Sequence, residues 1–306
     1  MVLEKLFVII VTYKGKQWYD CCFTSLREST IPVQTIVVDN ASNDGTVEYI
    51  RERFPEIHLI ESKENLGFGR ANNIGMRYAL YHGCDYVFLL NQDAWVEPDT
   101  FEKLIGIHLI HPEYGILSPI HLNAKKTGIE KGLVNYLDDK RITDRSLFED
   151  LYFSRLKELY ETNYVNAAAW LLPRSTLETV GGFDPIFSHY GEDDNYMHRV
   201  LFHKMKIGIC PKCKAVHDTE RRIVAAEKKI QTSSSSLLAE VTNVNNQLSI
   251  LGLCFFHLRK TISKLLVFKY PQAKDHWKIM LFLSKHAKAI ANSRKTNVRP
   301  GMNWLE

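Results

Sequence analysis

Residues 89–98 read LLNQDAWVEP, and this segment indicates the fold. The apolar run VFLL ends at Asn91-Gln92-Asp93, and a turn then leads to Pro98. A run that is apolar at every position is typical of a strand buried on both faces. The sequence therefore places the carboxylate of Asp93 where a buried strand reaches its end.

Similar apolar runs alternate with helix-like segments upstream. The expected strands are Leu6–Tyr13, Gln34–Asn40, Ile57–Ser62 and Asp85–Asn91, and the expected helices are Lys16–Glu28, Asp44–Phe54 and Gly69–Tyr81. Asn43 or Asp44 suits the N-cap of the second helix, and Pro98 suits the first residue of a further helix. This alternation predicts an α/β fold with a mostly parallel sheet flanked by helices.

Three of these strands end in polar residues. The ends are Thr12-Tyr13, Asp39-Asn40 and Asn91-Gln92-Asp93. Ligands bind at the carboxyl ends of strands in such sheets, although turn residues are polar for other reasons as well. Three polar ends on one edge favour a binding site.

A glycine-rich segment, GFGRANNIG at Gly67–Gly75, opens the third helix. Its N–H groups could face a phosphate, or its glycines could serve tight packing.

The regular alternation stops after Pro119. Residues 123–161 are polar and poor in strand patterns, and we expect an insertion that covers the site. An apolar segment, Tyr164–Arg174, predicts another strand, and Glu178–Lys204 is rich in glycine and carboxylates. Beyond a polar stretch, Ala225–Ser249, the chain becomes basic and apolar with helical spacing. We therefore predict a catalytic domain over residues 1–222 and a basic, mainly helical extension over residues 223–306.

The composition predicts a folded, soluble chain. The 306 residues are 45% hydrophobic and 24% charged, and the formal net charge is +4. The first residues do not resemble a signal peptide, and no apolar run approaches the ~18 residues of a membrane span. We therefore expect a cytoplasmic protein. Cys210 and Cys213 form a lone CxxC, which could be half of a zinc site or two reduced thiols.

The C-terminal region has an uneven charge. Residues 251–300 hold eleven Lys or Arg and one acid, Asp275. Such a region is either a solvated helix face or a contact for an anionic surface. Trp277 and Phe282, with neighbouring lysines at 274, 278 and 285, suit an interfacial helix at a membrane. A helical cap on the catalytic domain is the alternative, and no nucleic-acid partner is expected.

The acidic residues suggest metal-dependent chemistry. Asp93 suits Mg²⁺ or Mn²⁺, which bind carboxylates and the phosphates of a substrate. In the acidic segment Glu192-Asp193-Asp194, one carboxylate could act as a general base, and the same acids favour a helix N-terminus. His217 on its own would be a surface histidine.

Seven segments in one order resemble the family 2 glycosyltransferases with the GT-A fold, most closely their rhamnosyltransferase-like branch. They are VTYKG, VVDNASNDGT, ENLGFGRANNIG, LLNQDAWVEP, VGGFDPIF, YGEDDN and AVH, and the resemblance spans Leu6 to Arg222. It implies an inverting transfer of a sugar, such as rhamnose on dTDP, from a nucleotide-sugar donor. The implied acceptor is a glycan or a lipid-linked glycan of a surface polysaccharide, and the enzyme could lie on the inner face of the plasma membrane.

The resemblance assigns roles by position. Metal binding falls to Asp93 and His217, and catalysis to Asp193 as the base with Glu192 beside it. The implied donor-binding residues are Thr12, Tyr13, Asp39, Asn40, Asn65, Gly67, Asn73, Asn91 and Gln92. Asn91 takes the place of the first acid of the family's DxD motif.

The chain departs from the family pattern at one acid. The family often reads E-D-x-D, whereas Asn195 occupies the last of these positions here and Asp194 precedes it. Two other functions use a similar sheet: a nucleotidyltransferase acting on sugar phosphates, and a non-catalytic nucleotide-binding scaffold. The first would normally carry a Gly-rich basic loop after strand one, which VTYKGKQWYD does not match, and the retained acids argue against the second.

Overall fold

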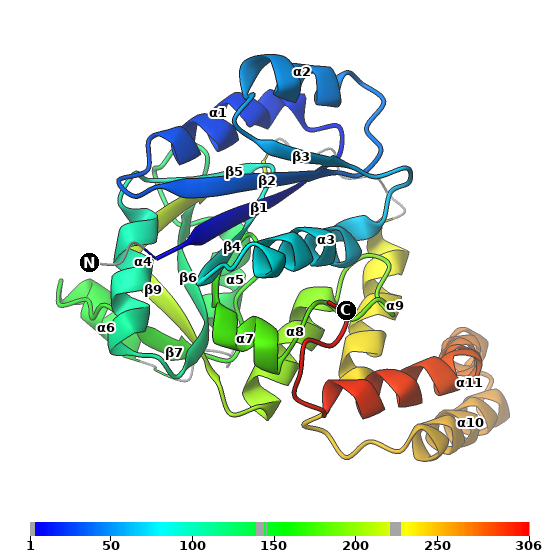
Figure 1. Ribbon diagram of the computed structural model, residues 1–306. Coiled ribbons are helices and arrows are strands. Elements are labelled where there is room, and N and C mark those ends of the chain that lie inside the picture. The colour runs from blue at the N-terminus through cyan, green and yellow to red at the C-terminus, as the bar shows by residue number, and fades with distance from the viewer. Residues whose placement is uncertain (1–3, 139–143, 145, 221–227, 306) are drawn as a thin grey trace.

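The computed structural model describes residues 4–138, 144, 146–220 and 228–305. Within these ranges one nine-stranded sheet has the order β3-β2-β1-β4-β8-β6-β9-β5, with β7 paired to β9 (Figure 1). The strands are β1 Leu6–Thr12, β2 Val33–Asp39, β3 His58–Glu61, β4 Tyr86–Asn91, β5 Ala94–Val96, β6 Tyr114–Leu122, β7 Tyr160–Thr162, β8 Ala169–Pro173 and β9 Lys206–His217. The helices are α1 Lys16–Arg27, α2 Thr46–Arg53, α3 Gly67–Tyr81, α4 Thr100–Ile110, α5 Lys131–Asp138, α6 Ser146–Tyr152, α7 Arg174–Thr179, α8 Glu192–Phe202, α9 Lys228–Thr242, α10 Ile250–Leu266 and α11 Tyr270–Asn297.

The N-terminal half of the sheet is parallel. Strand β1 pairs in parallel with β2 and β4, and β2 with β3. The register sets Thr12 opposite Asp39, and Val11 opposite Asn91. The three polar strand ends therefore meet on one edge, as the sequence predicts.

The second half of the sheet is mixed. Strand β8 runs antiparallel to both β4 and β6, and β5 and β7 run antiparallel to β9, whereas β6 and β9 are parallel. The predicted α/β sheet flanked by helices is confirmed, with antiparallel strands added.

Both faces of the sheet are buried, which explains the uninterrupted apolar runs. Phe7 and Ile9 pack into one core cluster with Met76 of α3. Val8 alternates with them and packs into a second cluster with Phe23 of α1. Alternate residues of a strand point to opposite faces, so every position of β1 needs an apolar side chain.

The helix starts differ slightly from the prediction. The N-cap of α2 is Gly45, so the prediction of Asn43 or Asp44 is wrong by one or two residues. Asp44 Oδ1 nevertheless accepts hydrogen bonds from the N–H and hydroxyl of Thr46, the first residue of α2, at 3.2 and 2.6 Å. Pro98 lies in the turn before α4, which begins at Thr100. Residues 123–161 contain α5, α6 and the start of β7 in place of a purely irregular insertion, and residues 139–143 and 145 lie outside the described part.

The cysteines of the CxxC segment face the core. Cys210 and Cys213 lie on β9 and pack into the second core cluster as free thiols. The β6–β9 register shifts between Cys210 and Lys214, so Cys213 lies within the irregular stretch. Each thiol therefore packs as a small apolar side chain.

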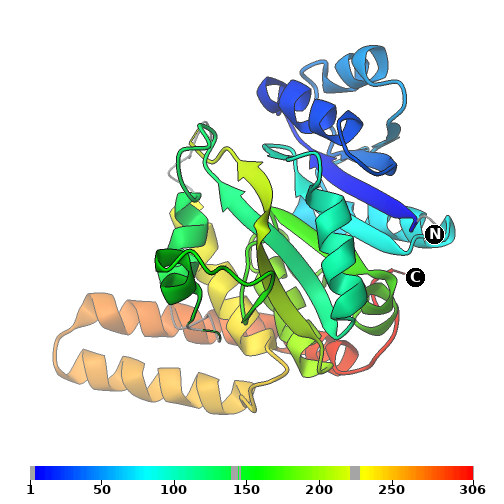
Figure 2. The ribbon, with the colours of Figure 1, turned by 90° about the vertical axis from the view of Figure 1, so that its left-hand side faces the viewer.

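The C-terminal extension is tied to the sheet domain. The expected boundary at residue 222 lies outside the described residues. Helix α9 packs near α8, and α10 and α11 form a hairpin beside the body of the molecule (Figure 2). No helix among the described residues is long and apolar enough to cross a membrane.

Residues 301–305 return to the sheet domain after the hairpin. The Gly182 N–H donates to the Asn303 carbonyl at 2.8 Å, and Leu305 is buried in the first core cluster. Asp184 Oδ2 accepts hydrogen bonds from Ser293 at 2.6 Å and Asn297 at 2.8 Å. The VGGFDPIF segment is therefore where the extension docks.

Candidate active site

The ends of β1 and β2 are joined through a buried carboxylate. Thr12 Oγ1 donates to Asp39 Oδ1 at 2.9 Å, and the Ser42 N–H donates to Asp39 Oδ2 at 2.8 Å. Asp39 is only 1% exposed. It therefore fixes the loop after β2 from within, and it borders the edge at which a donor is expected.

Asn40 holds the loop that opens α3. Its Nδ2 donates to the Gly67 carbonyl at 3.1 Å, and its Oδ1 accepts from the Leu66 N–H at 3.2 Å. Asn65 Oδ1 in turn accepts from the Gly67 N–H at 2.9 Å. Gly67 has φ +77°, and a Cβ there would lie 2.3 Å from the Ser188 carbonyl oxygen. Glycine is required at this close approach of two loops.

Asn73 lies deeper than the sequence suggests. It is 5% exposed, and its amide bonds both the N–H and the carbonyl of Phe183, at 2.7 and 2.8 Å. Asn73 therefore fixes the backbone of the segment before α8.

Gln92 joins the ends of β4 and β1. Its Oε1 accepts from the Tyr13 N–H at 2.9 Å, and its Nε2 donates to the Tyr13 carbonyl at 3.2 Å. The Tyr13 ring is 42% exposed and stands at this edge. The two hydrogen bonds hold an aromatic face beside the expected nucleotide position.

Asp93 and His217 meet beside Asn91. His217 Nε2 lies 3.5 Å from Asp93 Oδ1 and 3.4 Å from Asn91 Nδ2. All three come together because β5, which follows Asp93, pairs with the end of β9. His217 is 3% exposed, so the alternative of a surface histidine is wrong. The predicted metal-site pair is thus brought together by the fold.

This pair fits a divalent cation. Two ligand atoms 3.5 Å apart can both lie at about 2.1 Å from one cation. Within the described ranges no group of three or more His, Cys, Asp or Glu side chains could hold a metal. Water and a substrate diphosphate would supply the other ligands, as Mg²⁺ sites commonly require.

The acidic segment forms the first turn of α8. Asp193 Oδ1 accepts from the Asp194 N–H at 3.0 Å, and its Oδ2 accepts from the Tyr164 hydroxyl at 3.4 Å. The backbone N–H of Ala167 also bonds this carboxylate. The next residue, Ala168, accepts the Asn91 N–H at 2.9 Å. Ala167 and Ala168 are consecutive, so their backbone links the Asp193 carboxylate to the end of β4. The acidic turn therefore lies at the same edge of the sheet.

The two acids differ in their surroundings. Glu192 is 6% exposed, and its Oε2 has no hydrogen-bond partner. Burial, and then the charge of Asp193, raise the pKa of Glu192 to about 8. Burial also raises the pKa of Asp193, but four hydrogen bonds favour its charged form. Glu192 therefore holds its proton at neutral pH, and the hydrogen bonds to Asp193 favour that carboxylate as the proton acceptor.

Asn195 lies away from the acidic edge. It is fully buried; its Oδ1 accepts from Arg199 Nε at 3.1 Å, and its Nδ2 donates to Thr242 of α9 at 3.2 Å. The departure from the family's last acid thus affects the contact between α8 and α9. Asp194, half-buried, contributes its N–H to Asp193.

Several residues near the site were missed by sequence reasoning. The Tyr164 hydroxyl contacts Asp193. The Asp218 N–H donates to the Asp93 carbonyl at 2.9 Å, and the Asp218 carboxylate accepts from the Trp18 indole N–H at 3.1 Å. His121 stacks edge-on 6.0 Å from His217, and burial lowers its pKa to about 3. The only signal for Asp218 was its position after AVH.

Comparison with known proteins assigns the family. A model of glycosyl transferase family 2 matches residues 7–162, about half of the chain. The low-salt glycan biosynthesis hexosyltransferase Agl10 of Haloferax volcanii is 24% identical over 223 residues, which cover 71% of this chain and 68% of that protein. The dTDP-rhamnosyl transferase RfbF of Shigella flexneri is 24% identical over 216 residues, covering 70% and 69%.

The fold agrees with this assignment. The S. aureus TarS 1–349 crystal structure in complex with UDP-GlcNAc superposes with a TM-score of 0.56 at 14% identity, covering 96% of this chain and 90% of that one. This likeness confirms the predicted GT-A fold. The family match, the fold and the ordered segments together show that the chain belongs to the family 2 glycosyltransferases.

Proposed function

We propose that this glycosyltransferase moves a sugar from a nucleoside-diphosphate donor to a hydroxyl of a glycan or lipid-linked glycan, with inversion. The observation that supports this most strongly is the shared edge of Asp93, His217 and Asp193. Asp93 and His217 suit a site for the leaving diphosphate, and Asp193 suits a site for the acceptor hydroxyl. The names of RfbF and of a mycobacterial rhamnosyltransferase (26% identical over 211 residues) favour dTDP-rhamnose as donor.

Asp93 and His217 would hold a divalent cation, Mg²⁺ or Mn²⁺. When bound, such an ion neutralises charge on a departing diphosphate. Asn91 Nδ2 lies 3.4 Å from His217 Nε2, so its amide borders the cation position without adding charge. The Tyr13 ring would contact the nucleotide base, and Asp39 the ribose, with Thr12, Asn40, Asn65 and Gly67 shaping the loops around them.

Asp193 would take the proton of the acceptor hydroxyl. Hydrogen bonds to its carboxylate favour the charged form that accepts a proton. Burial raises the pKa of Glu192 beside it to about 8, so at neutral pH this second acid adds no charge. A single base and a direct displacement at the anomeric carbon invert the configuration. Tyr164, bonded to Asp193 Oδ2, would orient the carboxylate.

A donor screen tests this function. Purified protein with Mg²⁺ or Mn²⁺ is offered UDP-, GDP- and dTDP-sugars, and thermal shift and nucleoside diphosphate release are measured. We expect one donor to stabilise the protein only with metal, and Asp93→Ala to abolish the effect. No response to any donor in folded protein would contradict the proposal and favour the scaffold.

The base is tested with a matched pair of variants once an acceptor is found. Asp193→Asn should lower the transfer rate by about 10²–10⁴-fold, whereas Asp194→Asn keeps its N–H and should stay near wild type. NMR of the product should show the opposite anomer to the donor. Near-full activity of Asp193→Asn, or retention of configuration, would contradict the mechanism.

An enzyme that acts on a lipid-linked acceptor has to reach this acceptor at a membrane surface. We therefore also propose that the protein is cytoplasmic and peripheral on the inner face of the plasma membrane.

A further inference from the structure

Helix α10 exposes a stripe of large apolar side chains. Leu251, Phe255, Ile262, Leu265 and Leu266 are between 46% and 83% exposed. Their spacing places them on one face of the helix. A stripe of this length is unusual on a surface that contacts only water.

Helix α11 adds to the same side of the hairpin. Tyr270, Trp277 and Leu281 are 44–58% exposed and recur on one face of α11. Viewed from its own N-terminus, each helix carries its stripe clockwise from the face that contacts the other helix. Because the two helices run antiparallel, the same rotation brings both stripes to one side of the hairpin. Cys254 Sγ and Ser284 Oγ, 3.8 Å apart, mark that edge of the contact.

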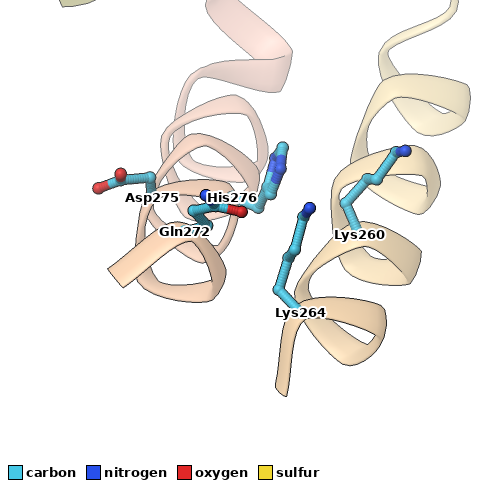
Figure 3. A pocket seen from close by; sticks show the side chains of 5 residues that line it. All are labelled: Lys260, Lys264, Gln272, Asp275 and His276. Carbon is cyan, nitrogen blue, oxygen red and sulfur yellow. The ribbon is translucent and has the colours of Figure 1, made fainter. Parts of the chain in front are cut away.

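The other side of the hairpin is mainly polar, with one exposed apolar side chain, Phe256, whose ring centroid lies 5.5 Å from Lys260 Nζ. Lys260 and Lys264 of α10 line a groove with Gln272 and His276 of α11, and Asp275 stands at its border (Figure 3). Asp275 is the one acid among residues 251–300. The hairpin is therefore amphipathic as a unit, and its acid lies away from the apolar stripes.

Lysines flank the apolar side. Lys274, Lys278, Lys285 and Lys288 are exposed on α11 close to the Trp277 and Leu281 stripe. Apolar side chains bordered by lysines match the boundary between headgroups and acyl chains of an acidic bilayer. Phe282, expected from sequence to face a membrane, instead packs against the third core cluster.

We propose that the apolar side of the α10–α11 hairpin, defined by the two stripes and these four lysines, docks on an anionic lipid bilayer. A second copy of this chain fits less well, because symmetric pairing through this side would bring the four lysines of each copy together without an acid between them. The docking is interfacial, since no described helix can span a bilayer.

The hairpin is connected to the acidic turn through α9. Ser235 Oγ donates to the His189 carbonyl at 2.8 Å, and Asn195 bonds Thr242. Docking would therefore hold the acidic turn at a fixed height above the bilayer. The use of that geometry for a lipid-linked acceptor rests on the proposed function, but docking itself does not.

Vesicle flotation of the full chain tests the docking without donor or acceptor. Vesicles of phosphatidylcholine alone are compared with vesicles containing 30% phosphatidylglycerol. We expect flotation with the anionic vesicles only. Lys278→Glu/Lys285→Glu should weaken binding by about 25-fold or more, at about fivefold for each lysine removed. Phe255→Ser/Leu266→Ser should weaken it at least tenfold.

Matched controls lie elsewhere on the surface. Tyr81→Ser replaces an aromatic side chain that is 88% exposed, and Lys131→Glu/Lys212→Glu reverses two exposed lysines; both should float like wild type. Equal flotation of wild type and both hairpin variants would overturn the proposal. A stable dimer by light scattering, dissociated by Phe255→Ser/Leu266→Ser and with no vesicle binding, would also overturn it. Point substitutions are preferable to truncation, because residues 301–305 pack into the catalytic domain.

Discussion

Replacing Glu192 with glutamine should change how stability depends on pH. Burial raises the pKa of Glu192 from 4.5 to about 8, so between these values the folded protein holds a proton that the unfolded chain has released. The folded state therefore binds more protons, and its stability falls as pH rises through this interval. At about 1.4 kcal/mol per pKa unit, Glu192 costs about 1 kcal/mol at pH 5 and about 4 kcal/mol at pH 8.

The assay is urea unfolding of wild type and Glu192→Gln at pH 5, 6, 7 and 8. The glutamine cannot ionise, so the variant should gain about 3 kcal/mol relative to wild type between pH 5 and pH 8. Glu64→Gln, at an exposed glutamate, is the matched control and should follow wild type. Parallel pH curves for wild type and Glu192→Gln would refute the assignment of the proton to Glu192.

Three further substitutions test other parts of the structure. Asn195→Asp should leave the transfer rate unchanged, because the side chain faces Arg199 and α9; a large change in kcat would contradict that placement. Gly67→Ala should destabilise by about 1–3 kcal/mol more than Gly83→Ala in urea unfolding, since both have positive φ but only Gly67 meets a backbone oxygen. Asp184→Ala removes the acceptor of two buried hydrogen bonds and should cost about 2–4 kcal/mol, with faster proteolysis of α11; unchanged stability would argue against docking at Asp184.

The parallel half of the sheet could be predicted because its signals are local. Apolar runs such as Leu6–Thr12 identify strands, and the polar residue after each run identifies the edge. The pairing of Asp93 with His217 was implied only by family resemblance, because it depends on β5 meeting β9 across more than 110 residues. Local periodicity carries no information on such contacts.

The sequence predicts the strands more easily than it predicts which polar side chains are buried. Asn73 and Asn195 occupy motif positions, yet both amides are used inside the protein. Tyr164 reaches Asp193 from a segment that reads only as apolar. Whether a polar side chain faces a ligand or another backbone depends on tertiary packing, which a single sequence does not state.

The return of residues 301–305 to Gly182 has a consequence for biosynthesis. Gly182 and Asn303, joined by a hydrogen bond, are about 120 residues apart in the chain. At about 5–20 residues per second, the ribosome needs about 6–24 s to make the intervening segment. During that time the segment before the acidic turn lacks its partner and leaves the cavity for Leu305 open. A nascent chain of this enzyme would therefore expose a specific apolar surface to chaperones until residues 301–305 emerge.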